Sequence, residues 1–170
     1  TLCRHLVKEG GSLDRTLTRL NAALADDNPS CMFVTLIHGV YDPRAGSVQF
    51  VSAGHPGPVL RRADGSIEEI AVASGRLLGY DTGELNLHEV EVRLHPGDVL
   101  VFVTDGLLEA RSPVDKALFG TERLRELVAG FLPQRSLADC AQEAKAAIES
   151  YTRSKELQDD LTLLLLRRKK

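Results

Sequence analysis

The sequence is poor in cysteine, in net charge and in long hydrophobic runs, and each deficit excludes a class of protein. Its 170 residues include only three cysteines (Cys3, Cys31 and Cys140), an odd number in no metal-like spacing, which fits free thiols in a reducing compartment. A formal net charge of −3 gives no general attraction to nucleic acid or to an anionic membrane. No apolar run approaches the roughly 20 residues that cross a bilayer, and no signal peptide or repeat is visible. We therefore expect a cytoplasmic protein with no nucleic-acid or membrane partner.

What the sequence does contain is ordinary for a globular domain. Hydrophobic residues make up 43% and charged residues 26%, and the length suits one domain with a proper core, spanning residues 1–170. The chain opens on what reads as the end of a helix, without an initiator methionine. We therefore expect that a segment upstream has been cut away.

The secondary-structure signals favour consecutive hairpins with amphipathic helices on either side of them. Strands are expected at 32–41, 47–52, 59–62 and 85–94, the last one half-exposed with a bulge near His88. Leucines at helical spacing predict a helix after Ser12, and further helices are expected from a cap at Thr121 to Gly130 and from a Ser136–Asp139 capping box. Amphipathic helices of this kind lie against a sheet.

The stretch from Pro96 to Ala110 is the centre of the pattern. Pro96-Gly97-Asp98 is typical of a turn, and 99–104 is a strand that is apolar on both faces, which indicates a position inside a covered sheet. Asp105 follows where the strand ends, and Gly106 is expected to let the backbone turn sharply beside it. A carboxylate at the mouth of a buried strand suggests a metal ligand or an acid/base, and a plain Asp-Gly turn is the alternative.

A second apolar strand, Leu161 to Leu166, carries acids at its start. If the two strands are antiparallel neighbours, Asp105 and Asp159 face each other across the edge of the sheet. Carboxylates that close repel unless a cation lies between them, and hard oxygen ligands suit Mg²⁺ or Mn²⁺. The alternative is that Asp159 and Asp160 only cap the strand in solvent.

His55 lies in a corner of the chain that is dense in glycine and proline, Ala53 to Pro58. It could serve as a ligand, a proton donor or a substrate contact. A lone histidine in such a corner more often hydrogen-bonds the local backbone, and we favour that structural interpretation.

Several short motifs occur in a fixed order along the chain, and as a set they carry a family resemblance. They are Phe33-Val-Thr-Leu36, Gly39-Val-Tyr-Asp42, Ala53-Gly-His-Pro56, Leu78-Gly79, Pro96-Gly-Asp98, Thr104-Asp-Gly106, Glu109-Ala110, Phe119-Gly120 and Asp159-Asp-Leu-Thr162. From about Met32 to Arg167 the chain resembles the sporulation stage II protein E branch of the type 2C metal-dependent serine/threonine phosphatases.

The resemblance implies an α+β fold, a four-layer α-β-β-α sandwich of two mainly antiparallel sheets flanked by helices. It also implies a centre of two Mn²⁺ or Mg²⁺ ions, with Asp105 and Asp159 as metal ligands and with Gly106 and Asp160 in the same site. No firm role is implied for His55, which stays a candidate substrate contact.

The sequence departs from the family pattern at its N-terminus. The family supplies an Asp in a Gly-Asp-aromatic strand and another in an Asp-x-x-Gly-x-Gly loop, and nothing here corresponds to either. We therefore expect the domain to lack its N-terminal strands and first metal-ligand motifs. The open sheet edge would invite aggregation or pairing with another chain, as in a dimer.

The function that the resemblance implies is hydrolysis of phosphoserine or phosphothreonine by a metal-activated water. The expected substrate is a phosphorylated protein, such as the anti-sigma factor antagonist of a partner-switching pathway, and the expected upstream partner is a sensor domain. Asp105-Gly-Leu-Leu is also similar to haloacid-dehalogenase phosphatases, but those need a nucleophilic Asp where Val103 stands and alternating βα units. The remaining alternative is a non-catalytic regulatory domain of the same fold that binds partners.

Overall fold

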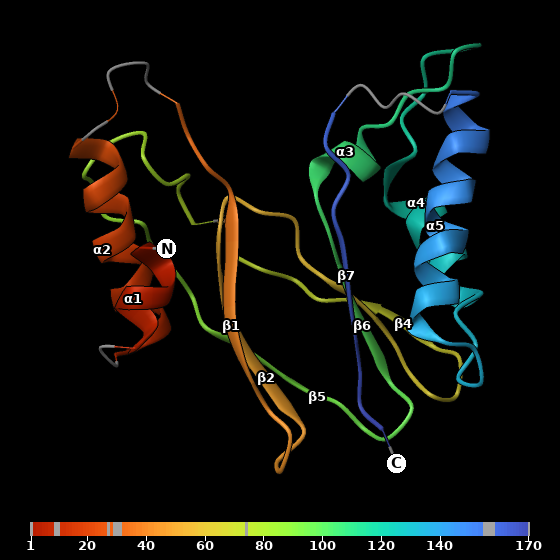
Figure 1. The fold of residues 1–170 in the computed structure, drawn as a ribbon, viewed down its shortest axis with the longest axis horizontal. Coiled ribbons are helices and arrows are strands. Elements are labelled where there is room, and N and C mark those ends of the chain that lie inside the picture. The colour runs from red at the N-terminus through yellow and green to blue at the C-terminus, as the bar shows by residue number, and fades with distance from the viewer. Residues whose placement is uncertain are drawn as a thin grey trace. The chain divides into compact units, whose positions relative to one another are not determined.

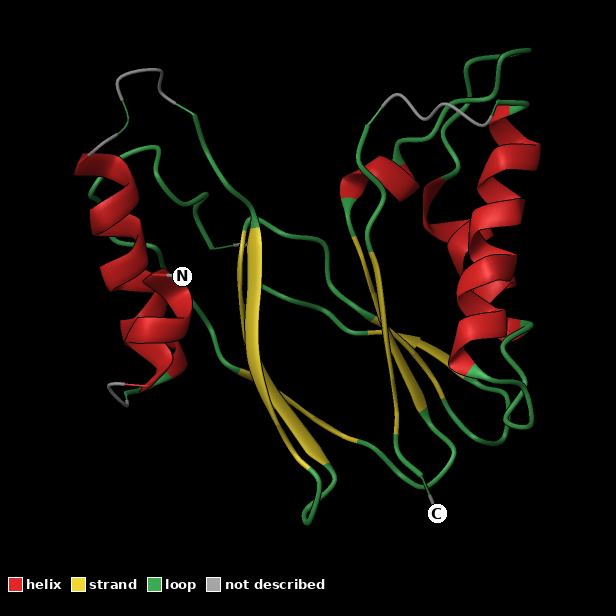
Figure 2. Cartoon of the chain, in the orientation of Figure 1, coloured by secondary structure: helices red, strands yellow, loops and turns green. Residues whose placement is uncertain are grey.

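The structure is a computed structural model that describes residues 2–8, 11–26, 28, 32–73, 75–154 and 159–169. Figures 1 and 2 show its helices and strands. No helix in the described part of the chain is long and apolar enough to cross a membrane. In chain order the elements are α1 (Leu2–Lys8), α2 (Leu13–Asp26), β1 (Leu36–Asp42), β2 (Ser47–Ala53), β3 (Val59–Arg61), β4 (Ile67–Glu69), β5 (Val90–Arg93), β6 (Val99–Val103), α3 (Asp105–Leu108), α4 (Gly120–Ala129), α5 (Leu137–Thr152) and β7 (Leu163–Arg167).

The chain divides into two compact units, each with its own sheet and helices. The first unit comprises residues 1–55 and 72–93, and the second comprises 56–71 and 94–170. The first holds a three-stranded sheet in the order β1-β2-β5, and the second a four-stranded sheet in the order β4-β3-β6-β7. Every neighbouring pair of strands in these two sheets is antiparallel. This confirms the expected α+β class with two antiparallel sheets and flanking helices.

In the first unit, α2 packs on the sheet through the leucines that its periodicity singled out. Leu17 is fully buried and Leu13 and Leu20 nearly so, and they share a core with Val51 of β2. β1 and β2 form the predicted hairpin, whose turn is fixed because Asp42 Oδ1 accepts hydrogen bonds from the Arg44 and Ala45 amides.

Two strands of the first unit are shorter than the sequence predicts. β1 begins at Leu36 rather than Met32, and before it Val34 makes an isolated bridge with Leu78, outside the sheet. β5 covers Val90–Arg93 rather than 85–94, because Asn86 adopts a left-handed conformation (φ 51°) that interrupts the extended chain. As expected, β5 lies at the edge of its sheet.

In the second unit, α4 and α5 cover one face of the sheet and close a larger core (Figure 1). β6 is buried at four of its five positions, which agrees with its apolar pattern, although Phe102 is only partly buried. The second apolar strand of the sequence is β7, which lies at the edge of its sheet and is not buried on both faces, since Leu164 is 57% exposed. The core also holds Cys140, which is free and buried as expected, while Cys31 lies outside the described residues.

The first residues of α5 and α4 are stabilised in different ways. At α5 the predicted cap is confirmed, since Ser136 Oγ accepts a 3.0 Å hydrogen bond from the Asp139 amide and donates to the Asp139 carboxylate. The prediction that Thr121 caps α4 is wrong, because that helix already begins at Gly120 with Phe119 as its N-cap residue. Phe119 is buried and packs edge-on against Tyr151 of α5, with ring centroids 5.3 Å apart.

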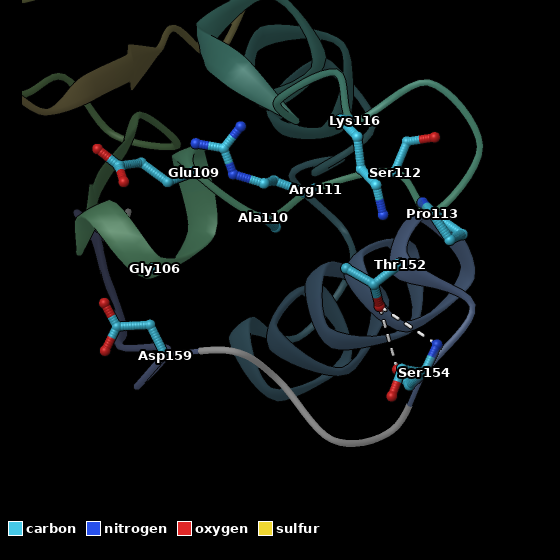
Figure 3. Close-up of a pocket in the computed structure, with 10 residues that line it drawn as sticks. All are labelled: Gly106, Glu109, Ala110, Arg111, Ser112, Pro113, Lys116, Thr152, Ser154 and Asp159. Carbon is cyan, nitrogen blue, oxygen red and sulfur yellow. Dashed lines mark hydrogen bonds between the residues drawn. The ribbon is translucent and has the colours of Figure 1, made fainter.

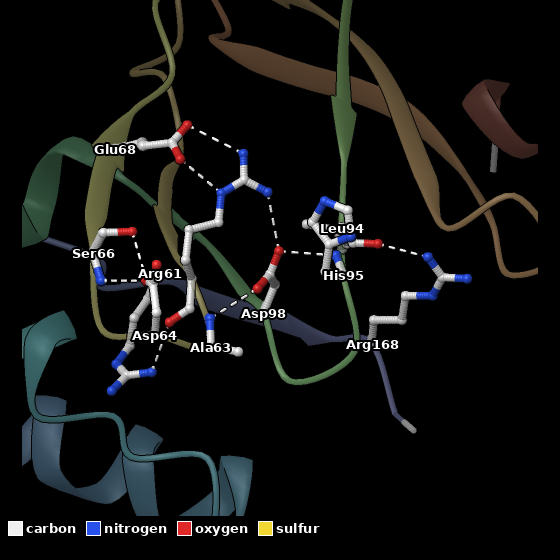
Figure 4. A network of polar contacts seen from close by, with 10 residues as sticks. Arg61, Ala63, Asp64, Ser66, Glu68, Leu94, His95, Asp98 and Arg168 are labelled. Atoms are coloured by element: carbon white, nitrogen blue, oxygen red, sulfur yellow. Dashed lines mark hydrogen bonds and ion pairs between the residues drawn. The ribbon is translucent and has the colours of Figure 1, made fainter.

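A buried carboxylate holds the turn before β6. Asp98 is 1% exposed and accepts hydrogen bonds from the Ala63 amide at 2.9 Å, the His95 amide at 2.8 Å and Arg62 Nη1 at 3.0 Å (Figure 4). Arg62 also pairs with Glu68 of β4. The residue that sequence reasoning assigned to an ordinary turn therefore joins the loop after β3 to the start of β6.

Candidate metal centre and adjoining pocket

The end of β6 lies beside the beginning of β7, as the sequence argument assumed. The register pairs Val103 with Leu163, and the ladder continues one step further through two threonines. The Thr104 amide donates to the Thr162 carbonyl at 3.1 Å, and the Thr162 amide donates to Thr104 Oγ1 at 2.9 Å. Thr104 Oγ1 in turn donates to the Asp160 carbonyl at 3.2 Å. These bonds fix the Asp159-Asp160 backbone to the end of β6.

Gly106 allows the two acidic segments to approach closely. It lies in the short helix α3, which the sequence did not predict and which starts directly after β6, and its φ is not positive, so a left-handed backbone is not the reason for a glycine here. A Cβ atom at this position would overlap the Asp160 carbonyl oxygen and would lie 3.5 Å from the Cβ of Asp159. Glycine is required here because the backbone of the opposite acidic segment occupies the space of a side chain.

The three carboxylates at this edge are exposed and partly oriented. Asp105 Oδ1 accepts a 3.0 Å hydrogen bond from the Gly106 amide, and Asp159 Oδ1 accepts a 2.7 Å bond from the Asp160 amide. All three of Asp105, Asp159 and Asp160 are exposed to solvent. Within the described residues, the second oxygen of Asp105 and of Asp159 has no protein hydrogen bond.

These carboxylates supply some of the oxygen ligands that a hard divalent cation needs. Mg²⁺ and Mn²⁺ prefer carboxylate oxygens, and Mg²⁺ commonly keeps several waters while one or two carboxylates hold it. The described part of the chain gathers no group of three or more His, Cys, Asp or Glu side chains that could hold a metal ion. The residues therefore fit one hydrated cation, and a pair of cations would need further ligands.

His55 makes the local contacts that the structural interpretation predicts. Its amide donates to Ser52 Oγ at 3.1 Å, and Ser52 Oγ donates to the His55 carbonyl at 2.7 Å, which closes the corner after β2. Its ring Nδ1 lies 3.0 Å from Thr35 Oγ1. These contacts explain the residue structurally, and its role toward a substrate stays a prediction.

A pocket of about 490 Å³ opens beside Asp159 in the second unit (Figure 3). Gly106, Glu109 and Asp159 line one side of it, and the Arg111 side chain extends toward that side, whereas Lys116 lines the opposite side (Figure 3). The residues that line it are Gly106, Glu109, Ala110, Arg111, Ser112, Pro113, Lys116, Thr152, Ser154 and Asp159. The pocket thus combines the candidate metal edge with two cations and several hydroxyl groups.

The loop from 111 to 118 that carries these cations is ordered by its own hydrogen bonds. A bridge joins Arg111 to Leu118, and the Ser112 amide donates to the Ala117 carbonyl at 2.9 Å. The Tyr151 hydroxyl, from α5, contacts the carbonyls of Ala117 and Leu118 at 2.9 and 3.0 Å. The sequence from Arg111 to Lys116 predicts only a polar loop, and nothing in its spacing indicates a pocket.

Comparisons with known proteins agree on one family. The profile of the family described as Stage II sporulation protein E (SpoIIE) matches residues 1–169. The phosphoserine phosphatase RsbU of Bacillus subtilis (strain 168) is 28% identical over an alignment 184 positions long, which covers 99% of this chain and 51% of RsbU.

Solved structures show the same fold. The RsbU and RsbW domains of Rv1364c from Mycobacterium tuberculosis match with a TM-score of 0.80 at 27% identity, over 99% of this chain and 45% of that one. The SiaA-PP2C domain of Pseudomonas aeruginosa matches with a TM-score of 0.81 at 21% identity, over 98% of this chain and 65% of that one.

The chain spans about half the length of RsbU.

Proposed function

The chain belongs to the stage II sporulation protein E family, and we propose that it forms the main part of a metal-dependent phosphatase domain that hydrolyses phosphoserine or phosphothreonine in proteins. The observation that carries the proposal is the packing of Asp105-Gly106 against Asp159-Asp160 at the end of β6. Two acidic segments brought together at the edge of a sheet, next to a pocket, provide oxygen ligands where a phosphorylated side chain can enter.

In this proposal Asp105 and Asp159 hold a Mn²⁺ or Mg²⁺ ion, and Gly106 and Asp160 complete that edge of the site. When bound, a pair of such ions supplies a hydroxide from water near neutral pH and neutralises phosphate oxygens during an in-line displacement. The backbone hydrogen bonds of Gly106 and Asp160 orient the two carboxylates before the metal arrives. We infer that the second ion takes further ligands from outside the described residues.

The substrate that we propose is a phosphorylated protein of a partner-switching pathway, an anti-sigma factor antagonist. The support is the resemblance to RsbU, which is itself a phosphoserine phosphatase. A sensor domain upstream and a cytoplasmic location are parts of the same proposal. RsbU, of which this chain spans about half, is long enough to hold a further domain. His55 is retained as a candidate contact to the substrate.

A second candidate is a non-catalytic, partner-binding domain with the same fold. One observation favours it, since the described residues gather no group of three metal-binding side chains. The two candidates differ in whether a cation at Asp105 and Asp159 supports hydrolysis.

The test measures hydrolysis of p-nitrophenyl phosphate and of a phosphoserine protein by the full-length protein, with Mn²⁺ and with a chelator. We expect chelator-sensitive turnover that Asp105→Asn and Asp159→Asn each reduce at least about 100-fold, since each removes a charged ligand. The matched control is Asp64→Asn, which makes the same change at an exposed hairpin turn.

Calorimetric titration with Mn²⁺ supplies a readout apart from turnover. Equal Mn²⁺ binding by wild type and Asp105→Asn would remove Asp105 from the site. Turnover that survives the chelator would refute the metal mechanism, and the absence of turnover in every condition would favour the non-catalytic candidate.

A further inference from the structure

The basic side of the pocket suggests what surrounds the phosphoserine in a substrate. Arg111 and Lys116 line the same pocket as Asp159, and both residues are exposed. In the described part of the chain neither side chain has a hydrogen-bond or ion-pair partner, unlike Arg62, Arg76, Arg125 and Arg135, which pair with acids. In Figure 3 the Lys116 side chain extends into the space between the lining residues. The pocket therefore offers cations that no internal acid neutralises through a direct contact.

Lys116 is set apart from the acidic side chains of the pocket, whereas the Arg111 side chain extends toward Glu109 (Figure 3). Glu109 and Asp159 lie toward the Gly106 end, whereas Lys116 lies with Ser112 and Pro113 on the opposite side (Figure 3). A phosphoryl group directed to a cation at Asp159 would leave the adjoining residues of its peptide near the basic side. Acidic side chains are favoured there because they are attracted to these exposed cations, an attraction that is strongest at low salt.

Lys116 is also held in an uncommon backbone conformation. Its φ is 61°, a left-handed value that non-glycine residues rarely adopt, and its amide donates to the Ser112 carbonyl at 3.1 Å. The Tyr151 hydroxyl supports the next two carbonyls of the loop, and the Tyr151 ring packs against Phe119. A loop fixed in this way presents the lysine without a large ordering cost on binding.

We propose that Arg111 and Lys116 select phosphoprotein segments that carry acidic residues beside the phosphoserine. The inference rests on the proposed function, because it places the phosphoryl group at the Asp105–Asp159 edge. It assigns the basic wall of the pocket to specificity and leaves the reaction itself to the metal edge.

The test is a binding measurement in the presence of Mn²⁺, with a non-hydrolysable phosphonate analogue at the phosphoserine position of each peptide, so that the metal edge is occupied and no hydrolysis occurs. Fluorescein-labelled peptides with either Asp or Ala on both sides of this analogue are titrated with the full-length protein, and Kd is read from anisotropy. We expect the acidic peptide to bind about 10-fold more tightly at low salt, and the preference to shrink as salt rises, because screening weakens exposed charges.

The variants Arg111→Glu and Lys116→Glu should each reduce the preference to about 2-fold or less. Lys116→Gly is a second variant that removes the amine and suits the left-handed backbone, so a folded protein with the same loss of preference is expected. Lys145→Glu is the matched control, since Lys145 lies on α5 away from the lining residues and is 67% exposed. It should keep the full preference.

Equal binding of the two peptides by wild type would overturn this inference and leave the proposed hydrolysis intact. A preference that Lys145→Glu reduces as much as Lys116→Gly would also overturn it, because the effect would then be one of net charge. If the metal-dependent turnover described above is absent while the preference is present, the proposed function fails and the basic wall stays a binding site.

Discussion

Removal of the Asp98 carboxylate should destabilise the second unit severely. The side chain is 2% exposed and accepts hydrogen bonds from two backbone amides, those of Ala63 and His95, as well as from Arg62. Asp98→Ala would leave both amides without their acceptor. Ala63 and His95 are exposed residues whose hydrogen bonds to Asp98 are only partly buried, so each amide left unpaired costs about 1–2 kcal/mol, toward the lower end of the range for buried donors. Breaking a buried ion pair typically costs about 3–5 kcal/mol.

The contribution of the arginine is smaller than that of the amides. Arg62 is 25% exposed and keeps Glu68 at 2.7 Å after the substitution, so its charge does not become isolated. Hydrogen bonds to Glu68 and then to Asp98 raise the pKa of Arg62, so it stays charged at any ordinary pH. We therefore expect Asp98→Ala to lower the free energy of unfolding by about 3–5 kcal/mol, dominated by the two amides.

Urea unfolding followed by circular dichroism measures this difference. Asp98→Asn keeps one acceptor oxygen, so it should cost less, about 2 kcal/mol. Glu68→Gln is the control, because it weakens the exposed half of the same network and should cost at most about 1 kcal/mol. Two results would refute the assignment of Asp98 as the structural centre of this turn. One is a loss of unfolding free energy below about 1 kcal/mol for Asp98→Ala at an unchanged m value, and the other is an equal loss for Glu68→Gln.

Three further outcomes are expected. Gly106→Ala should weaken Mn²⁺ binding in calorimetry at least about 10-fold, because the added methyl group would push the Asp160 backbone away. The control Gly130→Ala changes a glycine with an ordinary φ of −72° and should bind Mn²⁺ like the wild type. Leu163→Ala should lower the free energy of unfolding in urea melts by about 2 kcal/mol, because Leu163 packs against the core. Leu164→Ala, at a 57% exposed position, should lower it by no more than about 0.5 kcal/mol. Equal losses would contradict the assigned faces of β7. Burial lowers the pKa of His38 below its usual 6.5. Below about pH 6.5 the unfolded chain therefore binds the proton more readily than the folded chain, and the free energy of unfolding should fall. His38→Gln should flatten this dependence of the free energy of unfolding on pH, and His88→Gln, at an exposed position, should not.

Local signals in the sequence were enough for much of the secondary structure and for the candidate metal edge. The leucine spacing predicted α2, Ser136 and Asp139 predicted the start of α5, and turn residues predicted the β1–β2 and β3–β4 hairpins. The pairing of β6 with β7 was inferred from two apolar runs with acids at opposite ends. Each of these inferences rests on interactions within a turn, a helix or one strand pair, and short-range chemistry decides such interactions.

Only the tertiary structure decided which polar residues are buried and which apolar residues are exposed. Asp98 looks like any turn residue in the sequence, but folding brings the Ala63 amide and Arg62 to it from the loop after β3 and so buries its charge. Leu164 has the sequence environment of a core residue, yet the edge position of β7 leaves it exposed. Gly106 is a glycine because the Asp160 backbone lies against it, and Lys116 lines a pocket because Tyr151 of α5 holds its loop. These outcomes depend on contacts between segments more than 30 residues apart, and no local pattern encodes them.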